Sequence, residues 1–375
     1  MNNSNNTIDV KLAFPLQKGV ITLLFGIILW FIPPPSGLSA NAWHMFAIFA
    51  TTIFAIILKV MPMGAVTMIA LIFSALTGVT PLSAKGETVG ALSGFANATI
   101  WLIGIAMFIS RAVIKTGLGR RVALWFISKC GSNMLGVAYG LALSDLVLGP
   151  GIPSASARGG GIMYPITQSI ATAYNSEPGA TARRAGAFLM ICVSQIDAIV
   201  CTMFLTAMAG NPLIAELARS QGIEISWTTW FVGAIVPGIA SLILIPLTLY
   251  FIYPPQLKKT PEIPGIAREE LKKMGPMSLA EKIYFMFFIL LCTVGDIFFS
   301  IPATLSAFIG LAILLLSNIM SWKNIIEEKT AWDTMFWFAV LVMMANALNK
   351  YGMISWISKG IVGYVRHFEW LTVFL

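Results

Sequence analysis

The stretch Leu146–Ile162 reads LVLGPGIPSASARGGGI and interrupts an otherwise apolar part of the chain. A helix cannot run unbroken through GPGIP at 149–153, because proline lacks the backbone donor and clashes with the preceding turn. Apolar runs lie on both sides, from Met134 to Leu148 and from Gly161 to about Tyr174. Since neither run with its break makes a clean membrane crossing, we expect a re-entrant hairpin over residues 134–174. Irregular backbone at membrane depth must be buried in protein or line a cavity.

The composition around this stretch is that of a membrane protein. Of the 375 residues, 57% are hydrophobic and 11% charged, with a mean hydropathy of +0.83. Soluble domains carry roughly 25% charged residues, so a soluble enzyme, a disordered protein and a nucleic-acid binder are excluded. No nucleophile–base–acid arrangement, phosphate loop or metal-ligand spacing is visible, and we expect no enzymatic activity. The sequence predicts an all-α polytopic membrane protein.

Apolar runs of about crossing length define the remaining elements. A further apolar run, Ala185–Leu217, is broken at Thr206–Pro212 and predicts a discontinuous helix. Leu118–Cys130 carries three cations and predicts an amphipathic helix at the membrane interface. The predicted crossings are Leu16–Ile32, Trp43–Leu58, Met63–Val79, Thr99–Ile114, Trp227–Tyr253, Ile283–Phe299, Ala303–Met320 and Met335–Leu348.

The net charge of +8 is explained by topology. Lys11 and Lys18 precede the first crossing, whereas the loop Pro33–Ala42 has no cation, so the amino terminus is predicted to be cytoplasmic. The later cations collect on the same side, and no nucleic-acid partner is expected. The polar start of the chain has no leader pattern, which favours a bacterial inner membrane.

Two halves of the chain align with each other. TIWLIGIAMFISRAVIKTGL from Thr99 matches TMFWFAVLVMMANALNKYGM from Thr334, an offset of 235 residues. The number of crossings between them makes the copies antiparallel, and inverted repeats are typical of secondary transporters. We therefore divide the chain into 1–42, the tail and first span; 43–253, the first repeat; 254–281, a cytoplasmic linker; and 282–375, an incomplete second repeat. The offset puts the counterpart of Pro153 beyond Leu375, so we expect C-terminal truncation.

The two breaks contain the residues with binding chemistry. Ser154, Ala155, Ser156 and Gly159 lie where a helix restarts, and hydroxyls and free N–H groups at a helix start can bind a carboxylate. The alternative is a tight turn needed for packing. In the segment Thr206–Pro212, freed carbonyls and Asn211 can coordinate a cation, unless it is a plain helix end.

Arg158 is the most conspicuous single residue, since a guanidinium near mid-membrane is costly and usually functional. We expect it to pair with a substrate carboxylate. An empty carrier would then hold an unpaired buried cation and return rarely, which favours obligatory exchange. The alternatives are snorkelling to the interface for Arg158, and structural pairing for Asp145 and Asp197 rather than a proton or cation relay.

At these residues the chain resembles the divalent anion:sodium symporter family, and within it the plastid-type 2-oxoglutarate/malate translocators and their bacterial relatives. The resemblance covers almost the whole chain in order. The matching stretches are IILWFIPPPSGLSANAWHMFAIF from Ile27, IKTGLGRRVA from Ile114, IPSASARGGGI from Ile152, MFLTAMAGNPL from Met203, IYPPQLKK from Ile252, KMGPMS from Lys273 and AWDTMFWFAVLVMMANALNKYGMISW from Ala331.

The resemblance implies a homodimer in the lipid bilayer, with a scaffold part and a mobile part that moves like an elevator. The first hairpin tip of the family commonly reads Ser-Asn-Thr and meets substrate and sodium; here the matching residues are Ser154, Ala155 and Ser156. The segment Thr206–Pro212 matches the unwound segment of the fifth family helix. We expect substrate contacts from Arg158, Gly159, Thr206, Asn211 and Pro212, and a candidate sodium site at Ser154, Ala209, Gly210 and Asn211.

We therefore expect secondary active transport of dicarboxylates, with 2-oxoglutarate exchanged for malate. Two alternatives stay open. One is sodium-coupled symport of a di- or tricarboxylate, in which bound sodium would be the only cofactor. The other is a non-functional remnant of a truncated gene.

Overall fold

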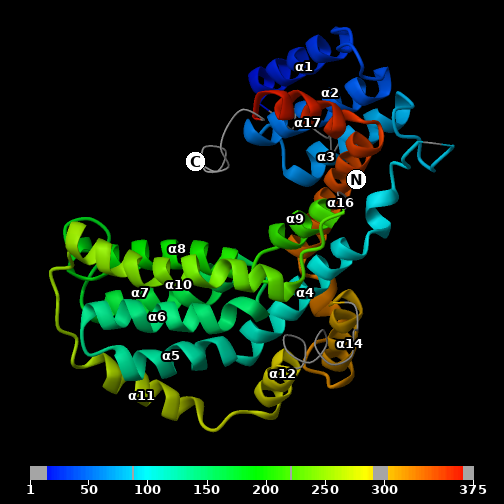
Figure 1. Ribbon diagram of the computed structural model, residues 1–375. Helices are drawn as coiled ribbons and strands as arrows, with labels where there is room; N and C mark the ends of the chain where they lie inside the picture. The colour runs from blue at the N-terminus through cyan, green and yellow to red at the C-terminus, as the bar shows by residue number, and fades with distance from the viewer. Residues whose placement is uncertain (1–14, 87, 220–221, 290–302, 366–375) are drawn as a thin grey trace, which may run out of the picture. The chain divides into compact units, whose positions relative to one another are not determined.

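The protein is an all-α polytopic membrane protein, seen here in a computed structural model that describes residues 15–86, 88–219, 222–289 and 303–365 (Figure 1). Six helices within these ranges are long and apolar enough to cross a membrane. Three shorter apolar helices accompany them. The predicted crossing Ile283–Phe299 and the end of the chain lie partly outside the described residues.

The chain forms two compact units. The first contains residues up to Ile100 and from Trp332 onward. It holds α1 (Leu16–Phe31), α2 (Ala40–Ile57), α3 (Met63–Leu76), η1 (Ser93–Ala96), most of α16 (Lys329–Lys350) and α17 (Met353–Val365). Small and thioether side chains form its core, among them Ala42, Met45, Ala70, Met343 and Met344.

The second unit, Trp101–Ala331, is built on packed long helices. In it α6 packs against α5 and α8, and α8 packs against α10, as the lower part of Figure 1 shows. Its elements are α4 (Ala98–Thr116), α5 (Leu118–Cys130), α6 (Met134–Leu148), η2 (Gly149–Gly151), η3 (Ser156–Met163), α7 (Tyr164–Ala173), η4 (Ala182–Arg184), α8 (Gly186–Met203), α9 (Gly210–Arg219), α10 (Trp227–Ile252), α11 (Ile263–Met274), α12 (Leu279–Ile289), α14 (Ala303–Leu316) and α15 (Trp322–Ile326).

The polar segment 254–281 is partly helical. Its central part folds as α11, an amphipathic helix that packs along α5. The pairs Arg120–Glu270 (2.9 Å) and Arg121–Glu281 (2.7 Å) join α5 to this segment. Two cations of the predicted interfacial helix α5 therefore face acidic partners within the protein.

Both predicted helix breaks are present. The first separates α6 from a helical stretch that starts as the π-helix η3 and continues as α7. Its second arm thus begins at Ser156, earlier than the expected Gly161. The second break spans residues 204–209, between α8 and α9.

The two segments aligned at an offset of 235 residues share one local conformation. In each, a long helix ends at a glycine with positive φ, and a shorter helix follows. The glycines are Gly117 (φ 81°) between α4 and α5, and Gly352 (φ 87°) between α16 and α17. A left-handed φ is nearly free for glycine and costly for other residues. The antiparallel orientation of the copies stays a prediction.

Candidate functional site

The two helix breaks of the second unit meet. Thr206 donates its hydroxyl hydrogen to the carbonyl oxygen of Pro150 at 2.8 Å, which ties the break after α8 to the break after α6. Gly149 permits this close approach, because a Cβ there would lie 2.5 Å from a methyl of Val200. Trp227 donates its indole N–H to Thr206 at 3.3 Å from the start of α10.

Three successive carbonyls in the first break each accept a side-chain hydrogen bond. Pro150 accepts from Thr206, Gly151 from the Tyr284 hydroxyl at 3.2 Å, and Ile152 from Arg158 at 2.8 Å. Unpaired carbonyls away from water are costly. Side chains from three elements therefore replace the missing helical hydrogen bonds.

Arg158 lies at the centre of this arrangement and is completely buried. Its Nε donates to Asp145 of α6 at 2.6 Å, and one terminal nitrogen donates to Asp197 of α8 at 2.8 Å. The same terminal nitrogen donates to Cys201 Sγ at 3.0 Å. The other donates to the carbonyls of Ile152 and Ala207, one from each break. All five guanidinium N–H groups thus have acceptors inside the protein.

This network removes the premise of the exchange argument based on Arg158. That argument assumed a guanidinium that stays unpaired without substrate, but Asp145 and Asp197 already supply two carboxylates. The structural pairing considered for the two aspartates is therefore present. Direct contact between Arg158 and a substrate stays a prediction that this arrangement does not favour.

Asn211 and Pro212 do not lie in the unwound segment. Both belong to the first turn of α9, where proline is tolerated because the first helical N–H groups need no intrahelical acceptor. The buried Asn211 amide donates to the carbonyls of Cys201 and Phe204, at 2.7 and 2.9 Å. Asn211 therefore caps the carboxyl end of α8. Its side-chain oxygen is the atom that would bind a cation.

The serines lie where the second arm begins. Ser154 accepts a hydrogen bond from the Ala157 N–H at 3.2 Å, as a helix N-cap residue does. Ser156 is exposed, whereas Ala155 and Gly159 are partly buried. A Cβ on Gly159 would lie 3.1 Å from Asp197 Oδ2, so glycine lets this turn approach the Arg158 network.

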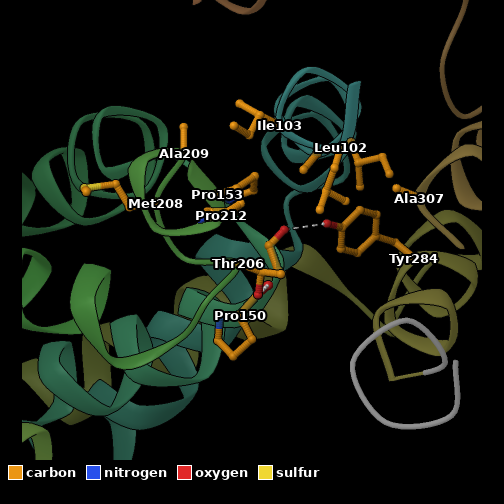
Figure 2. A pocket seen from close by; sticks show the side chains of 13 residues that line it. Leu102, Ile103, Pro150, Pro153, Thr206, Met208, Ala209, Pro212, Tyr284 and Ala307 are labelled. Carbon is orange, nitrogen blue, oxygen red and sulfur yellow. Dashed lines mark hydrogen bonds between the residues drawn. The ribbon is translucent and has the colours of Figure 1, made fainter. Parts of the chain in front are cut away.

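A small cavity lies beside the paired breaks. It has a volume of about 40 Å³, enough for roughly one water molecule and too small for a dicarboxylate. Figure 2 shows Pro150, Pro153 and Thr206 on one wall, with Leu102 and Tyr284 approaching from other elements. Thr206, Ala209 and Pro212 line it, but Asn211 does not.

The donor set fits an alkali cation better than a transition metal. No group of three histidine, cysteine or acidic side chains within the described ranges could hold a metal ion. The available ligands near the breaks are hydroxyl, amide and backbone oxygens, which suit hard cations. A sodium site at Ser154, Ala209, Gly210 and Asn211 stays a prediction.

The sequence missed two participants. Tyr284 lies on α12, 133 positions from its acceptor Gly151. No sequence pattern pointed to the contact of Cys201 with Arg158. A tyrosine in an apolar run was the available signal for the first, because a buried hydroxyl usually needs a partner.

The comparisons with known proteins decide the family. The model of the sodium:sulfate symporter transmembrane region matches residues 15–375. The chain belongs to the divalent anion:sodium symporter family. One relative is the protein named "Putative malate transporter YflS" of Bacillus subtilis. It is 49% identical over 368 residues, which are 97% of this chain and 76% of YflS.

Other relatives come from plants and bacteria. The protein named "Dicarboxylate transporter 1, chloroplastic" of Spinacia oleracea is 45% identical to this chain. The match covers 94% of this chain and 61% of the spinach protein. The inner membrane protein YbhI of Escherichia coli is 34% identical over 92% of this chain and 72% of its own length. The chain therefore spans about three fifths of the spinach relative and about three quarters of the bacterial ones.

Proposed function

We propose that this chain carries dicarboxylates across the bacterial inner membrane and exchanges 2-oxoglutarate for malate. The observation that carries the proposal is the meeting of the two helix breaks in one unit. The hydroxyls of Ser154 and Ser156 lie at a helix start there, and the positive end of a helix dipole favours a carboxylate. The names of the Bacillus and spinach relatives support dicarboxylates as the substrate class.

Exchange is proposed over sodium symport because of the sodium ligands. Ala155 stands where the family commonly has asparagine, so one amide oxygen is missing. Arg158 also bonds the carbonyls of Ile152 and Ala207, and a carbonyl so engaged is a poorer cation ligand.

The experiment uses this chain in liposomes loaded with malate or left empty. Uptake of labelled malate and of 2-oxoglutarate is measured with sodium or choline outside. We expect uptake only into loaded vesicles and no change when choline replaces sodium. Sodium-driven uptake into empty vesicles would favour the symporter, and absence of both binding and transport would favour the remnant.

Ser156 gives the site a direct test. Losing a hydrogen bond to a charged group costs roughly 1.5–3 kcal/mol. We therefore expect Ser156→Ala to weaken dicarboxylate binding about tenfold to hundredfold, measured by calorimetry in detergent. Ser83→Ala, an exposed loop serine of the first unit, is the control and should bind as before. Unchanged affinity in Ser156→Ala would exclude this carboxylate site.

The family also implies a homodimer whose mobile part moves like an elevator, and we propose both here. Cross-linking in native membranes followed by mass measurement tests the dimer. A chain that stays monomeric at all cross-linker concentrations would contradict it.

A further inference from the structure

A groove lies between α1, α2 and α3 in the first unit. It has a volume of about 530 Å³, within the range of small-molecule sites. Its walls are mostly apolar, with Leu23, Ile27, Ile48 and Ile69 among them. Nothing in the second unit contributes to it, so it is separate from the paired helix breaks.

The groove offers an occupant no unused hydroxyl along its walls. Thr22, Thr51 and Thr52 line it, but each donates to a backbone carbonyl four residues earlier, at 2.7–2.9 Å. A ligand that filled this volume would therefore gain little from polar atoms there. The walls fit a hydrocarbon chain.

Aromatic rings lie at one end of the groove. Trp30 of α1 stacks on His44 of α2 with ring centroids 4.1 Å apart, and it meets Phe73 of α3 edge-on at 5.3 Å. Trp30 and Phe73 both line the groove. We therefore place the polar head of an amphipathic ligand at the other end.

That other end is flanked by two lysines. α1 and α2 run antiparallel, with Phe25 beside Phe54 at 4.6 Å. Lys18 lies in the first turn of α1, and Lys59 lies just after the end of α2 at Ile57. Gly19 and Val60, the sequence neighbours of the two lysines, line the groove.

Both lysine side chains are exposed, and neither has a carboxylate within 4.0 Å among the residues that the structure describes. Asp333 of α16 lies at this end of α3, beside Gly64. Its carboxylate lies at the amino-terminal end of α3, which has no side-chain cap and whose dipole favours a negative charge.

The length of the groove matches one leaflet. From Gly19 to Trp30 the helix rises about 16 Å at 1.5 Å per residue. Half of the hydrocarbon core of a bilayer is about 15 Å. An acyl chain of one lipid would thus run from the lysines to the ring of Trp30.

We propose that this groove is a binding site for one anionic phospholipid, with an acyl chain between α1, α2 and α3 and the phosphate beside Lys18 and Lys59. A basic side chain near an anionic lipid surface contributes about 1 kcal/mol, a roughly fivefold preference. Two lysines then give a preference of roughly twentyfold to thirtyfold over a zwitterionic lipid.

Native mass spectrometry of the delipidated chain tests this, with phosphatidylglycerol and phosphatidylcholine of identical acyl chains. We expect one tightly retained phosphatidylglycerol per chain. Lys18→Gln/Lys59→Gln should lower its retention to that of phosphatidylcholine, and Lys85→Gln, in the loop at the far end of α3, should not. Equal retention of both lipids by the unmodified chain would overturn the proposal.

A second pair of variants tests the groove itself. Ile69→Trp fills it, whereas Ile72→Trp places the same ring at a similarly exposed position of α3 outside the lining. Only Ile69→Trp should lower retention of both lipids. A photoreactive group at the acyl terminus should label peptides near Trp30. Labelling elsewhere, or loss of dimers with unchanged lipid retention in Ile69→Trp, would contradict a lipid site.

Discussion

Arg158 shows how single residues hold two interrupted helices together. Burying a guanidinium costs several kcal/mol, and this cost is offset only when each N–H has a well-placed acceptor. Here the acceptors come from α6, α8 and both breaks. The same residue therefore satisfies backbone carbonyls that no helix can satisfy and neutralises carboxylates that would otherwise be buried alone.

Removing Arg158 should destabilise the protein strongly. Arg158→Gln leaves Asp145 and Asp197 without a cation, and breaking a buried pair in this way costs about 3–5 kcal/mol. Asp197→Asn should cost less, because Arg158 and Asp145 still balance each other. Thermal unfolding in detergent measures both. The control is Arg111→Gln, whose side chain is 57% exposed, with an expected loss below about 1 kcal/mol. Equal losses in Arg158→Gln and Arg111→Gln would contradict the role given to the network.

Two glycines in the hairpin allow a matched test of close approach. Gly149→Ala places a methyl 2.5 Å from the stiff Val200 side chain, and overpacking of this kind costs about 1–3 kcal/mol. Gly160→Ala meets nothing within 4 Å, so its stability should not fall. Unfolding midpoints of the two variants, compared under the same conditions, check the difference. A Gly149→Ala protein as stable as the unmodified chain would show that the two breaks can separate without cost.

At the scale of elements, the sequence predicted several helices closely. The predicted ranges Leu118–Cys130 and Met134–Leu148 coincide with α5 and α6, because glycine, proline and charge punctuate these apolar runs. The sequence analysis placed the second break at Thr206–Pro212, but it spans residues 204–209. Asn-Pro looked like an interruption, but a helix accepts proline in its first turn.

Tertiary contacts account for what the sequence did not predict. α11 lies in a polar segment, and its packing along α5 depends on a partner more than 130 residues away. The contact of Tyr284 with Gly151 has the same origin. Arg158, Asp145 and Asp197 were recognised as candidates, but spacing alone did not decide that they bind one another.

The join between α5 and the start of α12 should be sensitive to acid. Burial raises the pKa of Glu281, but hydrogen bonds from Arg121 and Ser278 and the charge of Arg121 outweigh it, so the pKa lies below its ordinary value. A carboxyl with a lowered pKa stabilises the folded state above the pKa of the unfolded chain. This contribution is lost as pH falls through the folded pKa.

Glu281→Gln should therefore reduce stability by roughly 1.5–3 kcal/mol at neutral pH, the loss expected for hydrogen bonds to a charged group. The difference from the unmodified chain should shrink as pH falls below about 4.5. Unfolding midpoints between pH 3 and pH 7 measure this. Glu327→Gln, at an exposed ion pair of 3.7 Å, is the control and should follow the unmodified chain throughout. A difference that stays constant down to pH 3 would contradict the assignment.

At the scale of the whole molecule, the internal repeat links local conformation to topology. The positive-φ glycines Gly117 and Gly352 recur at the offset of 235 residues found by aligning the sequence with itself. Local conformation cannot show which way each copy crosses the membrane. The distribution of cations predicts the orientation of each copy, because loops rich in lysine and arginine lie on the cytoplasmic side.

An antiparallel repeat puts Lys115 and Lys350 on opposite sides of the membrane, because each follows the same helix of its copy. Both side chains are exposed, so cysteine is tolerated at either position. In a background without the four native cysteines, a maleimide that cannot cross the membrane is added to intact cells. We expect it to label Lys350→Cys at once, and Lys115→Cys only after permeabilisation, because the cytoplasmic cations place Lys115 inside. Labelling of both from the same side would make the repeat parallel, and the reverse pattern would keep the inverted repeat but turn the whole protein over in the membrane.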